Sequence, residues 1–281
     1  MSQPTYFTFI AVIFPTLLLG QEADSVKVHL LGQDPWVPKD ELVCLRESFA
    51  ENIRYGSITS PRQIFPRSLI FPVSEYSSAR PTCKIEERAG VIIHHGLDRN
   101  HEYDIALEFI CLRPQQDDPF SYDFQPAADH FVVRNGHLVK VLGRPAKDWV
   151  EESGKRYRES LVLRDTSGTA FEMFNPAVNV DTTIFPVDEI DLLIQNNPQT
   201  DPFLKIIPIA EPRTRRGTGP SAIDENIHQG VCWLVLNVEL DDKPVLLGSE
   251  FKNKGADLGS PCPSYCPPKV SFRSSGVNGC K

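Results

Sequence analysis

The prolines constrain the fold of this chain more than any other sequence feature. There are 24 of them among 281 residues, together with 17 glycines, and they follow no collagen-like period. Proline lacks a backbone N–H donor and interrupts both helices and central strands. We therefore expect many short elements joined by turns, and neither long helices nor a coiled coil. With 41% hydrophobic and 23% charged residues, the chain has the composition of a globular protein with a packed core.

An uncharged, mostly apolar segment lies near the N-terminus, at residues 6–20 (YFTFIAVIFPTLLLG). It is short for a membrane-spanning helix, and Pro15 would disturb such a helix. Its length and composition are typical of a secretory signal peptide, which we predict over residues 1–20. A buried N-terminal helix or strand is the alternative. No later stretch is long and apolar enough to span a bilayer, so we expect a secreted, extracellular protein without a membrane anchor.

The seven cysteines agree with an oxidising compartment, where they would form up to three disulfides and leave one thiol. Their spacing leaves the pairing open. Cys262 and Cys266 lie close together between prolines, but a zinc site would need two more ligands at short spacing. We therefore expect a disulfide-pinned tail and no metal. The disulfide candidates are Cys44, Cys83, Cys111, Cys232, Cys262, Cys266 and Cys280.

Alternation and turn residues predict short strands, two helices and one clear hairpin. Apolar residues dominate 103–112 (YDIALEFICL), which is typical of a buried central strand. Residues 131–142 contain two β-rich runs around Asn135-Gly136, the pair best suited to a two-residue type I′ turn. Residues 41–55 predict a short strand and an amphipathic helix. A proline followed by acidic residues predicts a second helix over 185–196.

The order of strand, helix, further strands and final hairpin occurs in both halves of the chain. It predicts an α+β fold in which an antiparallel sheet packs on one helix, with two such units in tandem. The units would span residues 24–146 and 159–260, with a linker or an exposed helix at 147–158 and a basic, Cys/Pro-rich tail at 261–281. A single large β-rich domain is the alternative.

The charge balance limits the ways in which the chain can bind nucleic acid. Lys plus Arg number 29 against 37 Asp plus Glu, and this net charge of −8 excludes a uniformly basic coat but not a local basic patch. Residues 212–219 (PRTRRGTG) form either an exposed loop or an anion-binding loop. The candidates for RNA or anion binding are Arg134, Lys140, Arg144, Arg213, Arg215 and Arg216.

Histidines gather in one part of the sequence. Four of the seven lie between residues 93 and 131, together with Glu102 and Glu108. Acid–base cleavage of an RNA phosphodiester needs a base for the 2′-hydroxyl, an acid for the leaving oxygen and a cation or donor for the phosphate charge. His94 and His95 point to opposite faces if they lie on a strand, so at most one of them can belong to a given site. The alternative is that these are ordinary surface and turn histidines.

Two segments carry a resemblance to a known family. Residues 103–110 (YDIALEFI) and 128–141 (ADHFVVRNGHLVKV) resemble the second half of the small guanyl-specific fungal ribonucleases, within a similarity that covers residues 40–145. The resemblance implies a microbial-ribonuclease-like fold. It also implies that Glu108 holds the position of the catalytic base and that His101 is the candidate for the family's upstream histidine.

The same resemblance shows two departures from the family. His130 stands in the position of the phosphate-binding arginine, and Gly143-Arg144 stand where the family has its acid histidine. Loss of such groups costs about 10²-fold or more in rate for each. A ribonuclease-like scaffold without the catalytic set, behind a signal peptide, resembles the secreted ribonuclease-like effectors of plant-pathogenic fungi.

The resemblance therefore implies a catalytically degenerate effector that uses no cofactor and binds host protein or RNA, either outside or inside the host cell. The alternative is an active secreted ribonuclease or other hydrolase that uses Glu108 with His101 and His130. A third hypothesis is a structural or adhesive wall protein, against which the absence of Ser/Thr-rich repeats speaks.

Overall fold

The computed structural model describes the following residues: 26–29, 36–37, 39–116, 121–164, 169–174, 182–196, 201–210, 215–216, 223–224, 229–236, 255–256 and 260–262. The predicted signal peptide and nearly all of the predicted tail lie outside them. Within these residues the fold is α+β, with strands that pair almost entirely in antiparallel fashion. No helix there has the length and apolarity that crossing a membrane requires.

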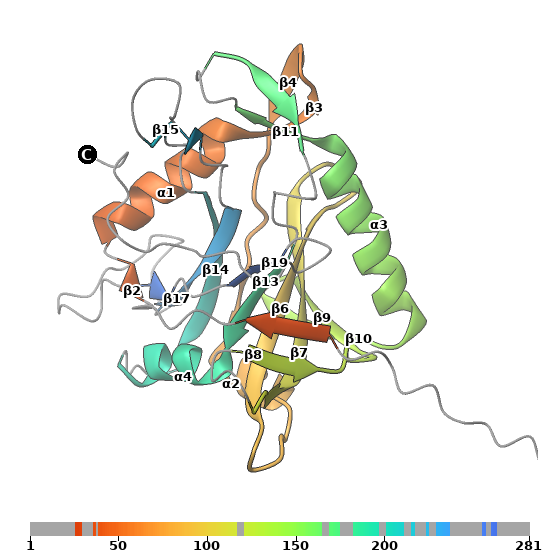
Figure 1. Cartoon of the computed structure of the whole chain (residues 1–281), viewed down its shortest axis with the longest axis vertical. Coiled ribbons are helices and arrows are strands. Elements are labelled where there is room, and N and C mark those ends of the chain that lie inside the picture. The colour runs from red at the N-terminus through yellow and green to blue at the C-terminus, as the bar shows by residue number, and fades with distance from the viewer. Residues whose placement is uncertain are drawn as a thin grey trace, which may run out of the picture.

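An eight-stranded sheet forms the centre of the molecule (Figure 1). Its two long strands pair over ten residue pairs, from Arg88↔Leu112 to Leu97↔Tyr103. Both are rich in β-branched and aromatic residues, which suit a pleated, buried surface. Across the sheet the strands run β1 (Val26–His29), β8 (Ser121–Phe124), β7 (Tyr103–Pro114), β6 (Arg88–Leu97), β13 (Thr182–Pro186) and β19 (Ser260–Cys262), with β9 (His130–Arg134) on β7 and β10 (His137–Val141) on β9.

The β9–β10 hairpin confirms the turn predicted from the sequence. Asn135 and Gly136 have φ angles of 52° and 78°, and His137 pairs directly with Arg134 across the turn. Positive φ at both central positions is what a type I′ turn requires, and Gly136 adopts it without strain. The hairpin fixes the register of β9, and with it the side of the sheet to which His130 points.

Three smaller sheets complete the strand arrangement. A five-stranded sheet runs β2 (Trp36–Val37), β18 (Gly255–Ala256), β17 (Gln229–Leu236), β14 (Phe203–Ala210) and β5 (Ile70–Pro72). A four-stranded sheet runs β12 (Phe171–Met173), β11 (Leu161–Arg164), β3 (Ile53–Ser57) and β4 (Ser60–Gln63), and a two-stranded one pairs β15 (Arg215–Arg216) with β16 (Ile223–Asp224).

Four helices, α1 (Lys39–Asn52), α2 (Val73–Ala79), α3 (Arg144–Ser160) and α4 (Val187–Gln195), lie around these sheets. The prediction of a helix over 185–196 is confirmed by α4. In α1 the side chains of Leu42, Leu45 and Phe49 are buried, whereas Val43 is exposed. The α3 helix packs so closely on β6 that a Cβ at Gly96 would collide with Ser153.

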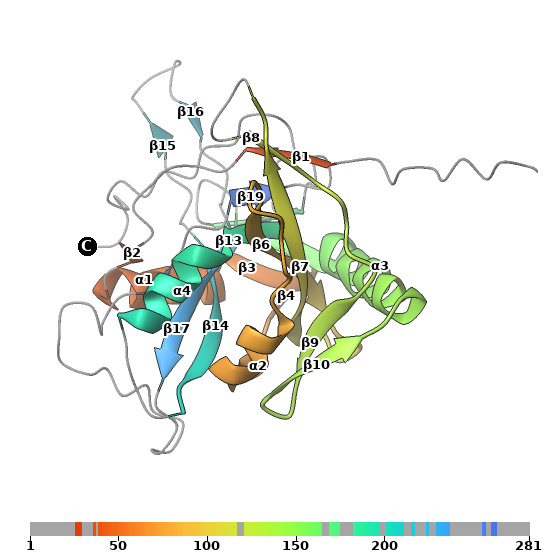
Figure 2. The same ribbon diagram turned by 90° about the horizontal axis from the view of Figure 1, so that it is seen from below.

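The main core lies between the eight-stranded and five-stranded sheets. Figure 2 shows α1, β14 and β17 on one side of the long strands β6 and β7, with α3 on the other. Trp233 of β17 packs in this core with Phe185 of β13 and with Leu107 of β7. On the opposite face of the eight-stranded sheet, here called the outer face, a smaller apolar cluster includes Ile92 and Ile110. The eight-stranded sheet therefore packs on the five-stranded sheet, and Tyr157 of α3 belongs to the same core.

The strand pairing does not follow the predicted division into two tandem units. Strand β13, from the second predicted unit, pairs with β6 of the first, and β14 pairs with β5. The predicted linker at 147–158 lies within α3. A repeated order of elements is a local property, whereas the partner of each strand is set by which apolar faces can be buried together. Strand pairs thus join residues 24–146 to residues 159–260 in the described part of the chain.

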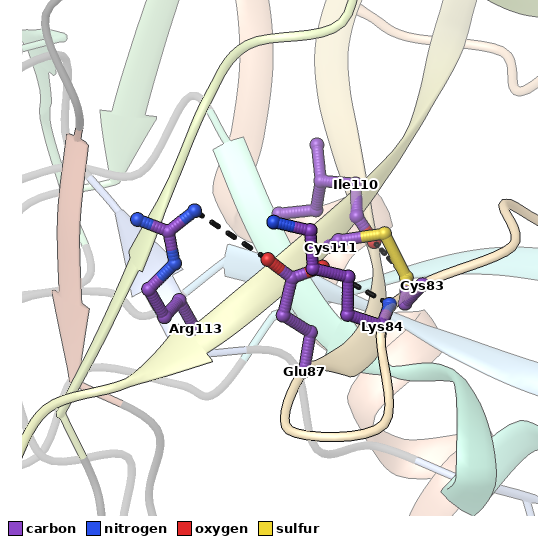
Figure 3. Close-up of a disulfide and its surroundings, with 6 residues drawn as sticks. All are labelled: Cys83, Lys84, Glu87, Ile110, Cys111 and Arg113. Atoms are coloured by element: carbon purple, nitrogen blue, oxygen red, sulfur yellow. Dashed lines mark hydrogen bonds and ion pairs between the residues drawn. A yellow bond between two sulfur atoms is a disulfide. The ribbon is translucent and has the colours of Figure 1, made fainter.

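The cysteines Cys83 and Cys111 form a disulfide with a Cα–Cα distance of 5.5 Å (Figure 3). It ties the loop before β6 to β7, and Glu87 secures the same loop by accepting a hydrogen bond from the Lys84 backbone at 3.2 Å. Cys44 is also disulfide-bonded. The side chains of Cys232, Cys262, Cys266 and Cys280 lie outside the described residues.

Glu189, in the first turn of α4, makes the stability of the fold depend on pH. Its Oε1 lies 3.3 Å from Arg88, and no described residue bonds its buried Oε2. Burial, aided by the charge of Asp188, raises the pKa of Glu189 to about 7, although Arg88 opposes the shift. The folded protein therefore holds a proton that the unfolded chain releases near pH 4.5.

We expect the free energy of unfolding to fall by about 2 kcal/mol as the pH rises from about 5 to about 8, because the buried carboxyl must then ionise. Glu189→Gln should remove most of this fall. Urea unfolding at both pH values measures it, and Glu86→Gln, at an exposed glutamate, is the control. Equal pH slopes for wild type and Glu189→Gln would contradict the prediction.

Candidate functional site

Three neighbouring strands bring two histidines and a glutamate together on the outer face of the eight-stranded sheet. His94 comes from β6, Glu108 from β7 and His130 from β9. The distance from Glu108 Oε2 is 2.7 Å to His94 Nε2 and 3.4 Å to His130 Nε2. We call these three residues the His–Glu–His cluster.

The strand register explains why these side chains meet. Leu107 pairs with Phe131, which places His130 beside Glu108, while His94 pairs with Ala106, the next outward-facing residue of β7. The small side chain of Ala106 leaves room above β7 for the two rings, whose centres lie 5.2 Å apart. The cluster is therefore held by three paired strands and not by loops.

The Glu108 carboxylate is nearly saturated with hydrogen bonds. Its Oε1 accepts the Ala127 backbone N–H at 2.5 Å, and its Oε2 faces both imidazoles. Burial alone would raise the pKa of Glu108, but hydrogen bonds from His130 and His94 outweigh it and lower the pKa to about 2. Glu108 is thus an ionised carboxylate that is only 4% exposed, while His130 is 7% and His94 16% exposed.

Of the three residues named as catalytic candidates for an active enzyme, the structure brings Glu108 and His130 together but places His101 elsewhere. His101 has a φ of 61° in the turn between β6 and β7, and its ring stacks on Tyr55 with a centre distance of 4.8 Å. It cannot reach the cluster from that turn, because Glu108 lies near the middle of β7. His94 occupies the place that the sequence analysis gave to His101.

His95 points to the opposite face, as strand geometry predicts for the neighbour of His94. It is buried, with Nδ1 2.6 Å from the Tyr103 hydroxyl and Nε2 2.8 Å from the Thr183 hydroxyl. Desolvation lowers the pKa of His95 to about 3, so its ring is neutral. His95 is a hydrogen-bonded residue of the core.

His94 was not placed next to Glu108 from the sequence, because their proximity depends on the register of two strands. The sequence feature that indicates this register lies in the turn that joins β6 to β7. Asp98 Oδ1 accepts backbone hydrogen bonds from Asn100 and Glu102. A turn centred near residue 100 pairs residues whose numbers sum to 200, and this puts His94 diagonally next to Glu108 on one face.

The candidates for anion binding do not form a basic patch in the described residues. Arg134 donates to both oxygens of buried Asp104, at 3.1 and 2.8 Å, and to its neighbour's backbone carbonyl. Lys140 pairs with Asp129 at 2.9 Å. Arg144 is almost fully exposed, and its nearest carboxylate contact, on the same helix, is 3.8 Å away. The side chains of Arg213, Arg215 and Arg216 lie outside the described residues.

Two cavities in the described part of the molecule are lined by other residues. One of about 520 Å³ lies between α1 and β14 and is bordered by Arg46, Phe65 and Lys205. The other, of about 390 Å³, borders Cys111 and extends to Pro126, next to the residue whose backbone binds Glu108. Among the three cluster residues, His94 has the most exposed side chain.

Known proteins give no further guide to this site, since no family model, no curated protein and no solved structure matches the chain.

Proposed function

We propose that the chain is a ribonuclease-like protein that cleaves RNA phosphodiester bonds by acid–base catalysis at the His–Glu–His cluster. One observation carries the proposal: Glu108 lies between the Nε2 atoms of His94 and His130 on three adjacent antiparallel strands. The unit of β6, β7 and the β9–β10 hairpin, with a glutamate on its central strand, also supports the resemblance to the fungal ribonucleases.

The geometry suggests a role for each residue. Glu108 holds the His94 ring at 2.7 Å, as carboxylates orient histidines in acid–base catalysis. His94 is the most exposed of the three, so it is the group that exchanges protons with the substrate. His130 stands where the family has its phosphate-binding arginine, and as a donor it would stabilise the developing phosphate charge.

Secretion and action on a host are part of the same proposal. The uncharged segment at residues 6–20 and the Cys83–Cys111 disulfide support passage through an oxidising compartment. The resemblance to secreted effectors suggests host RNA as the substrate or, if cleavage is absent, host RNA or protein as the partner.

A second candidate function is an effector that binds RNA or protein without cleaving RNA. Burial favours it, because Glu108 and His130 are only 4% and 7% exposed. The missing acid histidine at Gly143-Arg144 favours it as well.

RNA cleavage by the mature protein distinguishes the two functions. If the first is correct, His94→Ala and Glu108→Gln should each lower the rate by about 10²-fold or more. His137→Ala is the matched control, because His137 is an exposed histidine of β10 that pairs with Glu75 at 2.7 Å. Circular dichroism should first show that each variant is folded.

Cleavage that is unchanged in His94→Ala would contradict the assignment of the site. Salt-sensitive RNA binding without cleavage would support the second candidate. If the protein neither binds nor cleaves RNA, that result would contradict every RNA-directed function. A protein partner would then be the remaining hypothesis.

A further inference from the structure

We infer that His94, Glu108 and His130 form a binding site for one Zn²⁺ ion. Each residue offers one ligand atom, an imidazole nitrogen or a carboxylate oxygen, and these atoms all lie within 4.8 Å of one another. Two histidines and one carboxylate, with a fourth position open to water, are a ligand set of zinc sites in enzymes. This inference concerns metal binding alone and does not depend on RNA cleavage.

The spacing of the ligand atoms suits zinc. With bonds of about 2.0–2.1 Å, the ligand atoms of a tetrahedral zinc site are about 3.4 Å apart. The distance between Glu108 Oε2 and His130 Nε2 is 3.4 Å, and that between Glu108 Oε2 and His94 Nε2 is 2.7 Å. Zinc binding thus requires the distance between Glu108 Oε2 and His94 Nε2 to grow by less than about 1 Å. His94 has the most exposed side chain of the three ligands and so the most freedom to move.

The surroundings of Glu108 favour a bound cation. Its carboxylate is buried beside Ile92 and Ile110, and a buried charge is stabilised only when it is paired or coordinates a metal. The Ala127 backbone N–H holds Oε1 and leaves Oε2 to face the histidines. Such a second hydrogen bond orients a metal-ligating carboxylate.

The ligand types also limit which ion is bound. Imidazole nitrogen suits zinc and neighbouring transition metals, whereas Mg²⁺ and Ca²⁺ prefer sites made only of oxygen. His130 Nδ1 is buried and no described residue bonds it, so one imidazole lacks the outer hydrogen bond that strengthens most zinc sites. We therefore expect binding weaker than in a fully supported site.

The expectation of no metal was based on ligands that lie close together in the chain, at Cys262 and Cys266. The three ligands found here are 14 and 22 residues apart and meet only through strand pairing. If the cluster also cleaves RNA, zinc should inhibit cleavage, because it occupies the same three atoms. That consequence alone rests on the proposed function.

Calorimetric titration of the chelator-treated mature protein with ZnCl₂ tests the inference. We expect one Zn²⁺ per chain, with affinity at least about 100-fold weaker in His94→Ala and in His130→Ala. His137→Ala should bind like the wild type. Absence of stoichiometric binding by the wild type would overturn the inference, and so would unchanged affinity in both cluster variants, even if the protein cleaves RNA.

A second measurement on the wild-type protein covers the case in which a variant fails to fold. Co²⁺ replaces Zn²⁺ and reports its ligands in the visible spectrum. Intense d–d bands in the visible would show a four- or five-coordinate cobalt site, and we expect about one such ion per chain. A near-ultraviolet thiolate-to-cobalt band would instead place the ion on cysteine and overturn the inference.

Discussion

Truncation of Trp233 to alanine is expected to lower the free energy of unfolding by about 3–5 kcal/mol. Trp233 is fully buried, and its ring contacts Phe71, Tyr76 and Phe185 at centre distances of 6.4, 6.1 and 5.9 Å. These partners belong to β5, α2 and β13, so one ring joins the five-stranded sheet to the eight-stranded sheet. Removing the Trp233 ring would leave a cavity, and three separate elements would have to move together to close it.

Urea unfolding monitored by circular dichroism measures this effect without relying on tryptophan fluorescence. Trp233→Phe should cost clearly less, because most of the ring volume remains. Leu192→Ala, at an exposed position of α4, should change stability by less than about 1 kcal/mol. A Trp233→Ala loss no larger than that of Leu192→Ala would mean that the two sheets do not share a core.

Local features of the sequence predicted the local structure well. The Asn135-Gly136 turn needs positive φ at two consecutive residues, and few other pairs adopt it, so the hairpin could be read from the residues alone. The same holds for α4, where Pro186 precedes a first turn that carries Asp188 and Glu189. In both cases the information lies within a few residues.

Long-range pairing could not be predicted in this way. Nothing in residues 182–186 indicates that they pair with 90–94 rather than with a nearer strand. The register of β6 on β7 likewise decides that His94 and not His101 lies next to Glu108. Glu108 and His130 were named from the resemblance, because both lie in the segments that carry it. To predict the site from the sequence, one would have to know which strands are neighbours in the sheet and in what register they pair.

Removal of Arg134 is the second large effect that we expect. Asp104 is fully buried, and Arg134, which is 32% exposed, donates to both of its carboxylate oxygens. Burial raises the pKa of Asp104 even though Arg134 opposes the shift. Without Arg134 the ionised carboxylate would keep the Ile105 backbone N–H at 3.0 Å and the charge of Arg67 but would lose its ion pair. Breaking a buried ion pair on one side typically costs about 3 kcal/mol at neutral pH.

The loss in Arg134→Ala should depend on pH in a definite direction. In the variant, the pKa of Asp104 in the folded state should lie further above its value in the unfolded chain. The ionised carboxylate therefore lowers the free energy of unfolding of the variant at neutral pH. This loss disappears below about pH 4, where the carboxyl is protonated. Unfolding by urea at pH 7 and pH 4 measures the difference between wild type and variant. The control is Arg144→Ala, because the Arg144 side chain is nearly fully exposed. This substitution should barely change the free energy of unfolding at either pH.

A double variant separates the charge effect from simple loss of packing. In Asp104→Asn the buried charge is gone, so adding Arg134→Ala should cost much less than it costs in the wild type. The contrary result is that the two single variants lower the free energy of unfolding additively, with the same effect of Arg134→Ala at both pH values. That result would mean that the arginine contributes only packing. In that case Arg134 would remain available to bind an RNA phosphate, because its guanidinium would not be needed to neutralise Asp104.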